Sequence, residues 1–303
     1  MLWLTIALCS YLILAVVSLV DKFLLTKTTL MPKTYAFYVG VLQVLALILI
    51  FFVDFSLPGL RELLLSLISG VCFILGLYWL FKALHLFEAS RIVPAVGGLT
   101  PLFSLGLIFI FSLGQEKLVF SEIISFGFLI AGSILINVEL KKKINLTSLK
   151  MSLPAGFFLA LSFILIKYVY LVESFWNGLI WRSIGSFLFA CCFFIVFPEI
   201  KKEIFKKQEK VQQKNFLILI LNQAAGATAN ILQTWAVFLA PLVFVPFVHA
   251  LQGVQYVFLL IFVVFLSFKM PWILKEEITR KVIFQKIVAI LLIIIGLILI
   301  SLN

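Results

Sequence analysis

Long apolar runs alternate with short polar gaps along the whole chain. A helix needs roughly 20 mainly apolar residues, each rising about 1.5 Å, to cross a bilayer. Ten runs approach or exceed this length, at residues 2–23, 34–53, 63–84, 91–113, 119–138, 151–172, 175–197, 216–239, 242–267 and 283–302. The gaps leave no room for a soluble domain. The pattern therefore predicts an all-α integral membrane protein with ten transmembrane helices.

Two of the gaps are longer than a turn. Residues 199–215 and 269–281 carry charges of both signs in close alternation. Such segments form helices that lie at the membrane surface, or solvated linkers. We expect one or the other at both places.

The composition supports a lipid environment. Hydrophobic residues make up 64% of the 303 residues and charged residues only 12%, whereas soluble domains are about 45–50% apolar. The net charge of +11 is spread over the gaps, which indicates contact with the bilayer surface and argues against nucleic-acid binding. The four cysteines lie inside apolar runs without a metal-ligand spacing, so we expect no disulfide framework, metal or cofactor.

The first half of the chain repeats weakly in the second half. The matched pairs are Lys22 with Lys167, Gly70 with Gly226, Trp79 with Trp235, Pro94 with Pro246, and Gly132 with Gly296. Two repeats of five spans follow, at residues 1–140 and 150–303. Because five is odd, the second repeat enters the membrane from the opposite side, which predicts an inverted-topology pair. We expect Lys22 and Lys167, near span ends, to be surface anchors.

The passage "YWLFKALHLFEASRIVPAVGGLTP" at residues 78–101 combines charges, prolines and a glycine pair between two apolar runs. The charges mark the turn between the third and fourth spans, and the prolines and glycines open the fourth span. Prolines and small residues permit kinks and close helix approach. We expect hinges at Pro94, Gly97, Gly98 and Pro101, and at Pro246 and Gly253 in the second repeat. A kink without a binding role is the alternative.

Small and polar residues gather on single helix faces when positions are counted at about 100° per residue. The fourth span presents Gly97, Thr100, Pro101 and Ser104; the equivalent face of the ninth presents His249, Gln252, Gly253 and Tyr256; the eighth presents Gln223, Gly226, Asn230 and Gln233. Polar groups inside a membrane are costly unless they face protein or water. We interpret these faces as walls of a substrate cavity, with interhelical hydrogen bonding as the alternative.

These faces, with two tryptophans and one arginine, supply the candidate site. The candidate substrate-binding residues are Trp79, Thr100, Arg182, Gln223, Asn230, Gln233, Trp235, His249, Gln252 and Tyr256. Arg182 lies about six residues into the seventh span, roughly 9 Å deep, so snorkelling to the surface is an alternative role for it. Neither histidine has an acid three or four residues away inside a span. We therefore expect a protein that is not an enzyme.

The segment "LFKALHLFEASRIVPAVGGLTPLFSLGLIF" resembles the third and fourth spans of EamA-type drug/metabolite transporters, and "LGQEKLVFSEIISFGFLIAGSILI" resembles their fifth span with its preceding loop. The resemblance implies ten helices in two inverted five-helix repeats, in a prokaryotic plasma membrane. It implies a secondary transporter that moves a small metabolite, such as an amino acid or related solute, by alternating access. A flippase or transporter for a lipid-linked or amphiphilic group on the same fold is the alternative.

Two sequence features refine these expectations. No acidic residue lies in mid-membrane, and residues 1–20 contain none, which argues against proton-coupled export of cationic drugs. The excess of basic and amide groups in the spans favours a substrate with a carboxylate or other anionic group. The orientation is open, because Lys and Arg crowd the gaps after the fifth, seventh and ninth spans and place both termini outside, whereas the resemblance implies termini inside. Transport direction, coupling ion and oligomeric state are open too.

Overall fold

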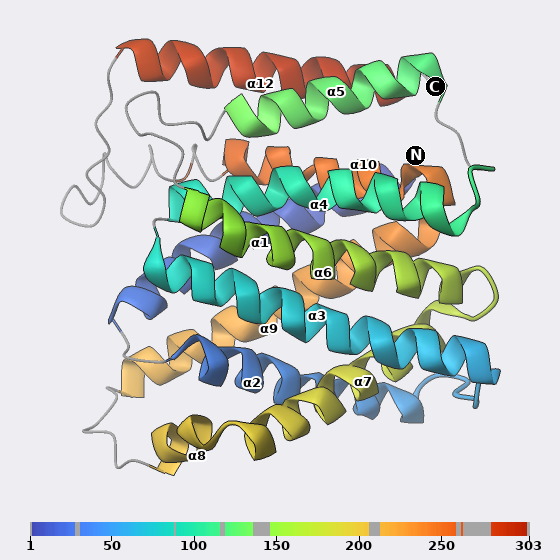
Figure 1. Ribbon diagram of the computed structural model, residues 1–303, viewed down its shortest axis with the longest axis vertical. Helices are drawn as coiled ribbons and strands as arrows, with labels where there is room; N and C mark the ends of the chain where they lie inside the picture. Colours follow the sequence, from blue (N-terminus) through green and yellow to red (C-terminus); the bar gives the residue numbers. More distant parts are fainter. Residues whose placement is uncertain are drawn as a thin grey trace.

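The computed structural model describes residues 2–27, 31–87, 89–115, 119–135, 146–205, 213–258, 262 and 280–301. This part of the chain is all-helical and contains no strand. The longer helices lie side by side and run across the molecule in roughly one direction (Figure 1). Such an arrangement is the one a helical bundle takes in a bilayer, where every backbone polar group must be paired within its own segment.

Each of the ten expected segments overlaps a helix. The elements are α1 (Leu2–Lys27), α2 (Pro32–Leu42), the 3₁₀ helix η1 (Gln43–Phe51), α3 (Leu60–Leu86), α4 (Ala89–Phe111), α5 (Phe120–Leu135), α6 (Leu146–Tyr170), α7 (Phe175–Val196), α8 (Pro198–Phe205), α9 (Gln213–Leu239), the 3₁₀ helix η2 (Leu242–Phe244), α10 (Val245–Ala250) and α12 (Arg280–Ser301). Residues 252–258, after a turn at Leu251, are helical as well.

Five of the helical stretches are long and apolar enough to cross a membrane, judged by length and composition over the described residues. They are Leu2–Val20, Pro32–Phe51, Leu60–Leu86, Lys150–Tyr170 and Phe175–Val196. Many large apolar side chains point outward, including Phe51 (86% exposed) and Phe120 (75%). A lipid solvent accepts such a surface, whereas water does not. The protein is therefore a membrane protein, and the remaining expected crossings stay a prediction.

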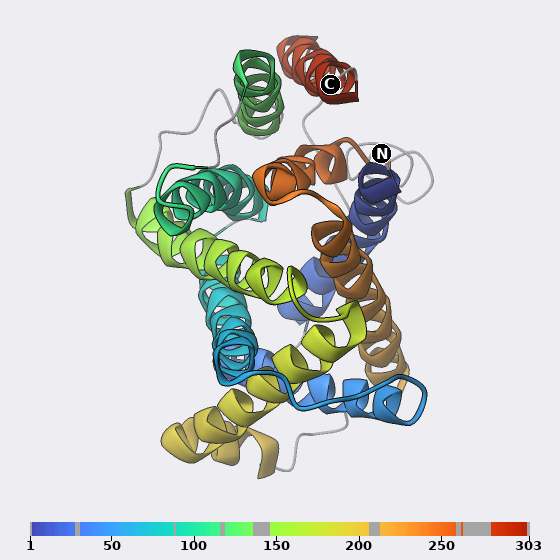
Figure 2. The same cartoon turned by 90° about the vertical axis from the view of Figure 1, so that its right-hand side faces the viewer.

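Helices from the two halves of the chain pack against each other. The main pairs are α1 with α9, α2 with α7, α3 with α6 and α7, α4 with α6 and α10, and α5 with α12. Seen along the helices, α5 and α12 form a separate pair at one edge of the bundle (Figure 2). The core is thus built between the halves rather than inside each half.

Glycines bring α3 and α7 into backbone contact. A Cβ added to Gly70 would lie 2.1 Å from the carbonyl oxygen of Arg182, and one on Gly185 would lie 2.4 Å from that of Leu67. Ser186 Oγ donates a hydrogen bond to the carbonyl oxygen of Gly70 at 3.0 Å. Close approach of this kind is the usual role of small residues between membrane helices. It fixes the backbone that carries Arg182.

The predicted hinge positions behave differently in the two halves. Helix α4 runs without interruption from Ala89 to Phe111, through Gly97, Gly98 and Pro101. In the second half, α10 ends at Ala250 and the helix resumes beyond a turn at Leu251, between Pro246 and Gly253. The side chain of Pro94 lies outside the described part. The second expected span also changes its helix type, from the α-helix α2 to the 3₁₀ helix η1.

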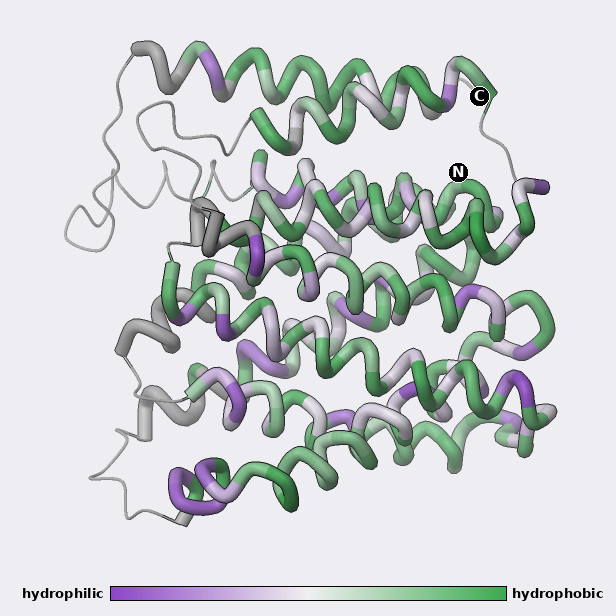
Figure 3. The backbone as a smooth tube through the Cα atoms, in the orientation of Figure 1, coloured by the Kyte–Doolittle hydropathy of each residue, from purple (hydrophilic) through white to green (hydrophobic). Residues whose placement is uncertain are grey.

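Hydrophilic residues gather near helix ends, most densely over α8 (Figure 3). Helix α8 covers the first part of the expected surface segment at residues 199–215. Nearly all of the other expected surface segment, residues 269–279, lies outside the described residues, as does the side chain of Lys22. The anchor role predicted for Lys167 is wrong. Lys167 is 4% exposed, and its Nζ donates to the carbonyl oxygens of Phe238 (2.9 Å) and Ala240 (2.5 Å) at the end of α9.

Candidate functional site

Arg182 lies in the interior of the bundle. Its side chain is 3% exposed. Nη1 donates to Thr234 Oγ1 at 3.0 Å and to Asn230 Oδ1 at 3.5 Å, both on α9, and Nη2 donates to Ser162 Oγ on α6 at 3.3 Å. The snorkelling alternative is therefore wrong, because the guanidinium points between α6 and α9 instead of toward a surface.

Two phenylalanine rings lie against the Arg182 guanidinium. Its central carbon is 4.5 Å from the ring centroid of Phe73 on α3 and 5.1 Å from that of Phe163 on α6. Cation–π contacts of this kind strengthen when they are desolvated. Among the described residues, Arg182 has no carboxylate partner, and its Nε has no hydrogen-bond partner. Within the described part of the chain, the positive charge is thus buried without a neutralising anion.

His249 on α10 is the second buried group with an unused nitrogen. It is 1% exposed, and its Nδ1 lies 2.7 Å from Ser104 Oγ on α4. Its ring centroid is 4.8 Å from that of Phe163. Its Nε2 has no hydrogen-bond partner among the described residues. Phe163 therefore contacts both Arg182 and His249, which come from different helices.

We call this set the central polar array. It consists of Arg182, Ser162, Asn230, Thr234, Phe73, Phe163, His249 and Ser104. Its members come from α3 and α4 in the first half of the chain and from α6, α7, α9 and α10 in the second. Nearly all buried polar atoms in proteins are hydrogen-bonded. Two unpartnered nitrogens in one array are therefore unusual.

The small face of α4 meets the polar face of the ninth expected span. A Cβ on Gly97 would lie 2.2 Å from Tyr256 Oη and 3.1 Å from Gln252 Oε1. Tyr256 Oη donates to the carbonyl oxygen of Val93 at 2.6 Å. Thr100 Oγ1 donates within its own helix, to the carbonyl oxygen of Val96 at 2.8 Å. The notch over Gly97 is filled by Tyr256, so this stretch packs closely.

The polar arc of α9 does not converge on one point. Gln223 Nε2 donates to Tyr35 Oη on α2 at 2.7 Å, and Gln233 Nε2 donates to Tyr11 Oη on α1 at 2.9 Å. Of the predicted amides on α9, Asn230 is the one that contacts Arg182. Gln223 and Gln233 thus act as hydrogen-bonding links between helices.

The predicted tryptophans lie in separate aromatic clusters. The Lys82 ammonium is 4.7 Å from the Trp79 ring centroid. Trp235 packs on Phe175 and Trp176, at centroid distances of 4.9 and 5.6 Å. No described contact joins either indole to Arg182 or His249. Trp79 and Trp235 lie outside the central polar array.

Several members of the array could not be selected from the sequence. Phe73 and Phe163 are two of 33 phenylalanines in the chain, so residue type gives no signal for them. Ser162 carries a weak signal as a polar residue in the middle of an apolar span. Outside the array, Tyr11, which donates to the carbonyl oxygen of Val248 at 2.8 Å, has a similar signal in the first span.

Contacts across two helix pairs are reciprocal under the sequence repeat. When the two halves are aligned so that Pro94 matches Pro246, Gly97 matches His249 and Ser104 matches Tyr256. The contact of Gly97 with Tyr256 and the contact of Ser104 with His249 are therefore equivalent under the repeat. The α5 and α12 pair shows the same reciprocity at its repeat glycines, Gly132 and Gly296. A Cβ added to one glycine would contact the two residues that lie three and seven positions before the other glycine in the sequence. Gly132 faces Ala289 and Ile293, and Gly296 faces Ser125 and Leu129.

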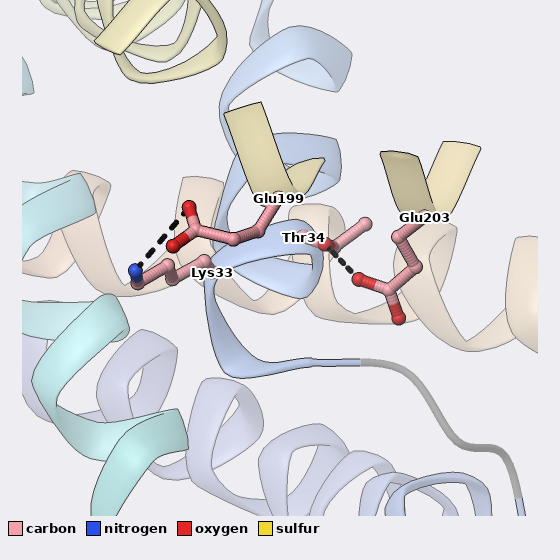
Figure 4. Close-up of polar contacts among 4 residues, drawn as sticks. All are labelled: Lys33, Thr34, Glu199 and Glu203. Carbon is pink, nitrogen blue, oxygen red and sulfur yellow. Dashed lines mark hydrogen bonds and ion pairs between the residues drawn. The ribbon is translucent and has the colours of Figure 1, made fainter. Parts of the chain in front are cut away.

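The start of α2 is held by α8, through contacts that we call the α8 clamp (Figure 4). Glu203 accepts hydrogen bonds from the Met31 backbone N–H at 2.8 Å and from Thr34 Oγ1. Glu199 pairs with Lys33 at 3.7 Å. Carboxylates at a helix N-terminus satisfy its free N–H groups and its dipole. The α8 clamp therefore fixes α8 against the first turn of α2.

The start of α7 is held in a similar way by the segment after η1, through contacts that we call the Ser56 clamp. The Ser56 backbone N–H donates to Asn177 Oδ1 at 3.4 Å, and Trp181 Nε1 donates to the Ser56 carbonyl oxygen at 3.1 Å. The Phe55 ring stacks on Trp181 with centroids 5.4 Å apart. The two clamps lie at opposite ends of the bundle (Figure 1).

No protein-family model and no curated protein matches this chain. A solved crystal structure, described only as that of a protein, matches 98% of this chain and 97% of its own with a TM-score of 0.66 and 14% sequence identity. At this identity the similarity shows a shared fold, and a fold does not by itself specify a function.

Proposed function

We propose that this protein is a secondary transporter that moves a small metabolite across a membrane by alternating access. The observation that carries the proposal is the central polar array, where Arg182 and His249 are buried with unused nitrogens between helices of both halves. Polar groups in a membrane interior are costly and mark substrate pathways when they are not fully paired inside the protein. A purely structural network would leave fewer polar atoms unpaired.

The same proposal includes ten spans in two inverted EamA-type repeats, at residues 1–140 and 150–303, in a prokaryotic plasma membrane. The reciprocal contacts of α4 with His249 and Tyr256 of the ninth expected span, and of α5 with α12, support it, because a pseudo-twofold axis maps each contact of a pair onto the other. Inverted repeats place substrate sites at the interface between the repeats, near the bilayer midplane. The central polar array lies between helices of the two halves.

The clamps supply the two closures that alternating access requires. In the α8 clamp, the segment that follows α7 is joined to the first turn of α2. In the Ser56 clamp, the segment that follows α2 and η1 is joined to the first turn of α7. Because α2 and α7 occupy equivalent places in the proposed repeats, the clamps are equivalent too, at opposite membrane faces. With both clamps formed and Arg182 3% exposed, we assign this conformation to an occluded state of the proposed cycle.

Six of the ten candidate binding residues divide into two groups under this proposal. Gln223, Gln233 and Tyr256 have hydrogen-bond partners on neighbouring helices, so we assign them to helix packing. Arg182 and His249 have unused nitrogens, and we assign them, with Asn230, to the substrate.

The test is solute flux in proteoliposomes containing the purified protein. The vesicles are offered labelled organic acids, amino acids, nucleosides and sugars. Flux through the wild type is compared with flux through an N230A/H249A double variant and through protein-free vesicles. Saturable flux of one solute class that the double variant lacks is the expected result. Phospholipid scrambling is measured on the same vesicles.

Two outcomes would contradict the proposal. Flux equal to that of protein-free vesicles for every solute class, while the protein scrambles lipid, favours a lipid-handling protein instead. Saturable flux that the double variant retains in full removes the central polar array from the substrate path.

A further inference from the structure

We propose that the transported solute is a monocarboxylate and that its carboxylate binds the free edge of the Arg182 guanidinium. This inference rests on the proposed transport function and names its substrate class. It starts from the hydrogen-bonding capacity that the central polar array leaves unused.

The Arg182 guanidinium has donors to spare. Arginine carries five N–H donors in a fixed planar fork. Among the described residues, Nη1 donates to Thr234 and Asn230, Nη2 donates to Ser162, and Nε has no partner. Nε and Nη2 share one edge of the guanidinium plane. Two donors on one edge match the two oxygens of a carboxylate in a bidentate pair.

Because Phe73 and Phe163 lie against the guanidinium, an incoming group must bind it at an edge. The rings of Phe73 and Phe163 lie 4.5 and 5.1 Å from the guanidinium carbon. They stack on the cation and offer no hydrogen bonds. A group that binds Arg182 must therefore use the remaining N–H donors at its edge.

Charge balance favours one negative charge on the solute. A buried cation without an anion pays a desolvation penalty that an incoming carboxylate offsets. Lys167, the nearest other buried cation by sequence, is occupied by the carbonyl oxygens of Phe238 and Ala240. A phosphate group carries about −1.5 to −2 charges near pH 7 and would leave the site negative. A monocarboxylate neutralises Arg182 and leaves no excess charge.

Access to this edge requires movement of helices. Arg182 is 3% exposed, so a solute reaches it only when α7 separates from α6 or α9. Alternating access provides that separation on either side of the membrane. The carboxylate then enters from one face and leaves by the other.

The experiment is binding to the purified full chain in detergent, followed by thermal stability. Ligands that bind the folded state raise its apparent stability by mass action. The probes are lactate, isovalerate and benzoate, each beside its primary amide, together with inorganic phosphate. We expect at least one carboxylate to stabilise the wild type, while its amide and phosphate give no shift.

Arginine variants place the binding on Arg182. We expect R182M to weaken binding of the carboxylate that stabilises the wild type at least tenfold. R182K, which keeps the charge but loses the planar fork, weakens it less and serves as the test if R182M does not fold. K201M is the matched control, because Lys201 is a cation over a phenylalanine ring, 5.3 Å from Phe194, but is exposed. It should bind as the wild type does.

Four results would overturn the inference. These are a wild type that no carboxylate probe stabilises, equal stabilisation by acid and amide, stabilisation by phosphate alone, and undiminished carboxylate binding in both R182M and R182K. Because binding is measured without a membrane, it is independent of the flux assay. Flux of a neutral solute without carboxylate binding contradicts this inference and leaves the transport function standing.

Discussion

At the scale of single residues, neighbouring positions on α4 differ sharply in the side chains they accept. A Cβ on Gly97 would meet Tyr256 Oη at 2.2 Å, whereas one on Gly98 would meet Ile134 at 3.4 Å. The first distance requires Tyr256 to move and to lose its hydrogen bond to Val93. The second is close to an ordinary van der Waals contact. Gly97 is therefore a packing requirement and Gly98 is not.

We expect Gly97→Ala to destabilise the protein by about 1–3 kcal/mol, the usual cost of overpacking. Gly98→Ala, its matched control, should leave stability unchanged or raise it by up to about 1 kcal/mol through helix propensity. Thermal unfolding in detergent of the two variants beside the wild type checks this. Equal stability of the two variants would show that Tyr256 does not fill the notch.

Lys167 gives a second prediction at this scale. Replacing it by methionine leaves the carbonyl oxygens of Phe238 and Ala240 without their donor. An unsatisfied buried polar group costs about 1–3 kcal/mol, and we expect Lys167→Met to lower thermal stability accordingly. Lys150→Met, at an exposed position of the same helix, is the control and should have no effect. A surface-anchor role for Lys167 predicts similar effects of both changes.

At the scale of elements, the repeat glycines Gly70 and Gly226 differ in how closely a neighbouring helix packs against them. Gly70 lies against the α7 backbone at Arg182 and Ser186, whereas the nearest atom to a Cβ on Gly226 is Val17 Cγ1 at 3.6 Å. The sequence repeat marks both glycines, but it does not indicate which of them carries a close crossing. The difference arises from the partner helix, α7 for one glycine and α1 for the other.

We expect Gly70→Ala to destabilise the protein by about 3 kcal/mol or more, at the upper end for overpacking, because backbone atoms of α7 must move. It should also weaken solute binding, since the same crossing positions Arg182. Gly226→Ala should be neutral or slightly stabilising. Thermal stability with and without solute measures both effects, and a Gly70→Ala protein as stable as the wild type would remove the crossing from the account.

At the scale of the whole molecule, the sequence pattern predicts the helices well and the site only in part. Apolar runs locate ten helical segments because helix length and bilayer thickness are linked. The pattern does not indicate how deep a side chain lies or which neighbour it meets. The sequence leaves open whether Arg182 binds substrate or snorkels to a surface, and helix packing buries it. Some residues gain their role only through tertiary contacts, such as Phe163 in the central polar array and Ser56 in the Ser56 clamp. The sequence around each of them gives almost no indication of that role.

The two clamps predict opposite changes in access. Glu203→Ala removes the acceptor for Met31 and Thr34 at one end, and Asn177→Ala removes the partner of Ser56 at the other. In a protein whose one retained cysteine is Cys72, which is 4% exposed beside Phe73, each variant should speed labelling by an impermeant maleimide. We expect the two variants to do so from opposite sides of the membrane.

The control for this prediction is Lys202→Ala, on the exposed side of α8, which should leave labelling at the wild-type rate. Labelling is measured in membrane vesicles of both orientations. Faster labelling from the same side in both clamp variants would contradict the assignment of the clamps to opposite gates.

Solute counterflow tests the central claim, alternating access by a carrier, most directly. Proteoliposomes are preloaded with unlabelled solute, diluted into a trace of the labelled solute, and sampled over time. A carrier that exposes the central polar array to one side at a time predicts a transient accumulation of label inside the vesicles above its equilibrium level. Monotonic equilibration that is independent of the preloaded solute would indicate a channel or a leak, and would contradict the account.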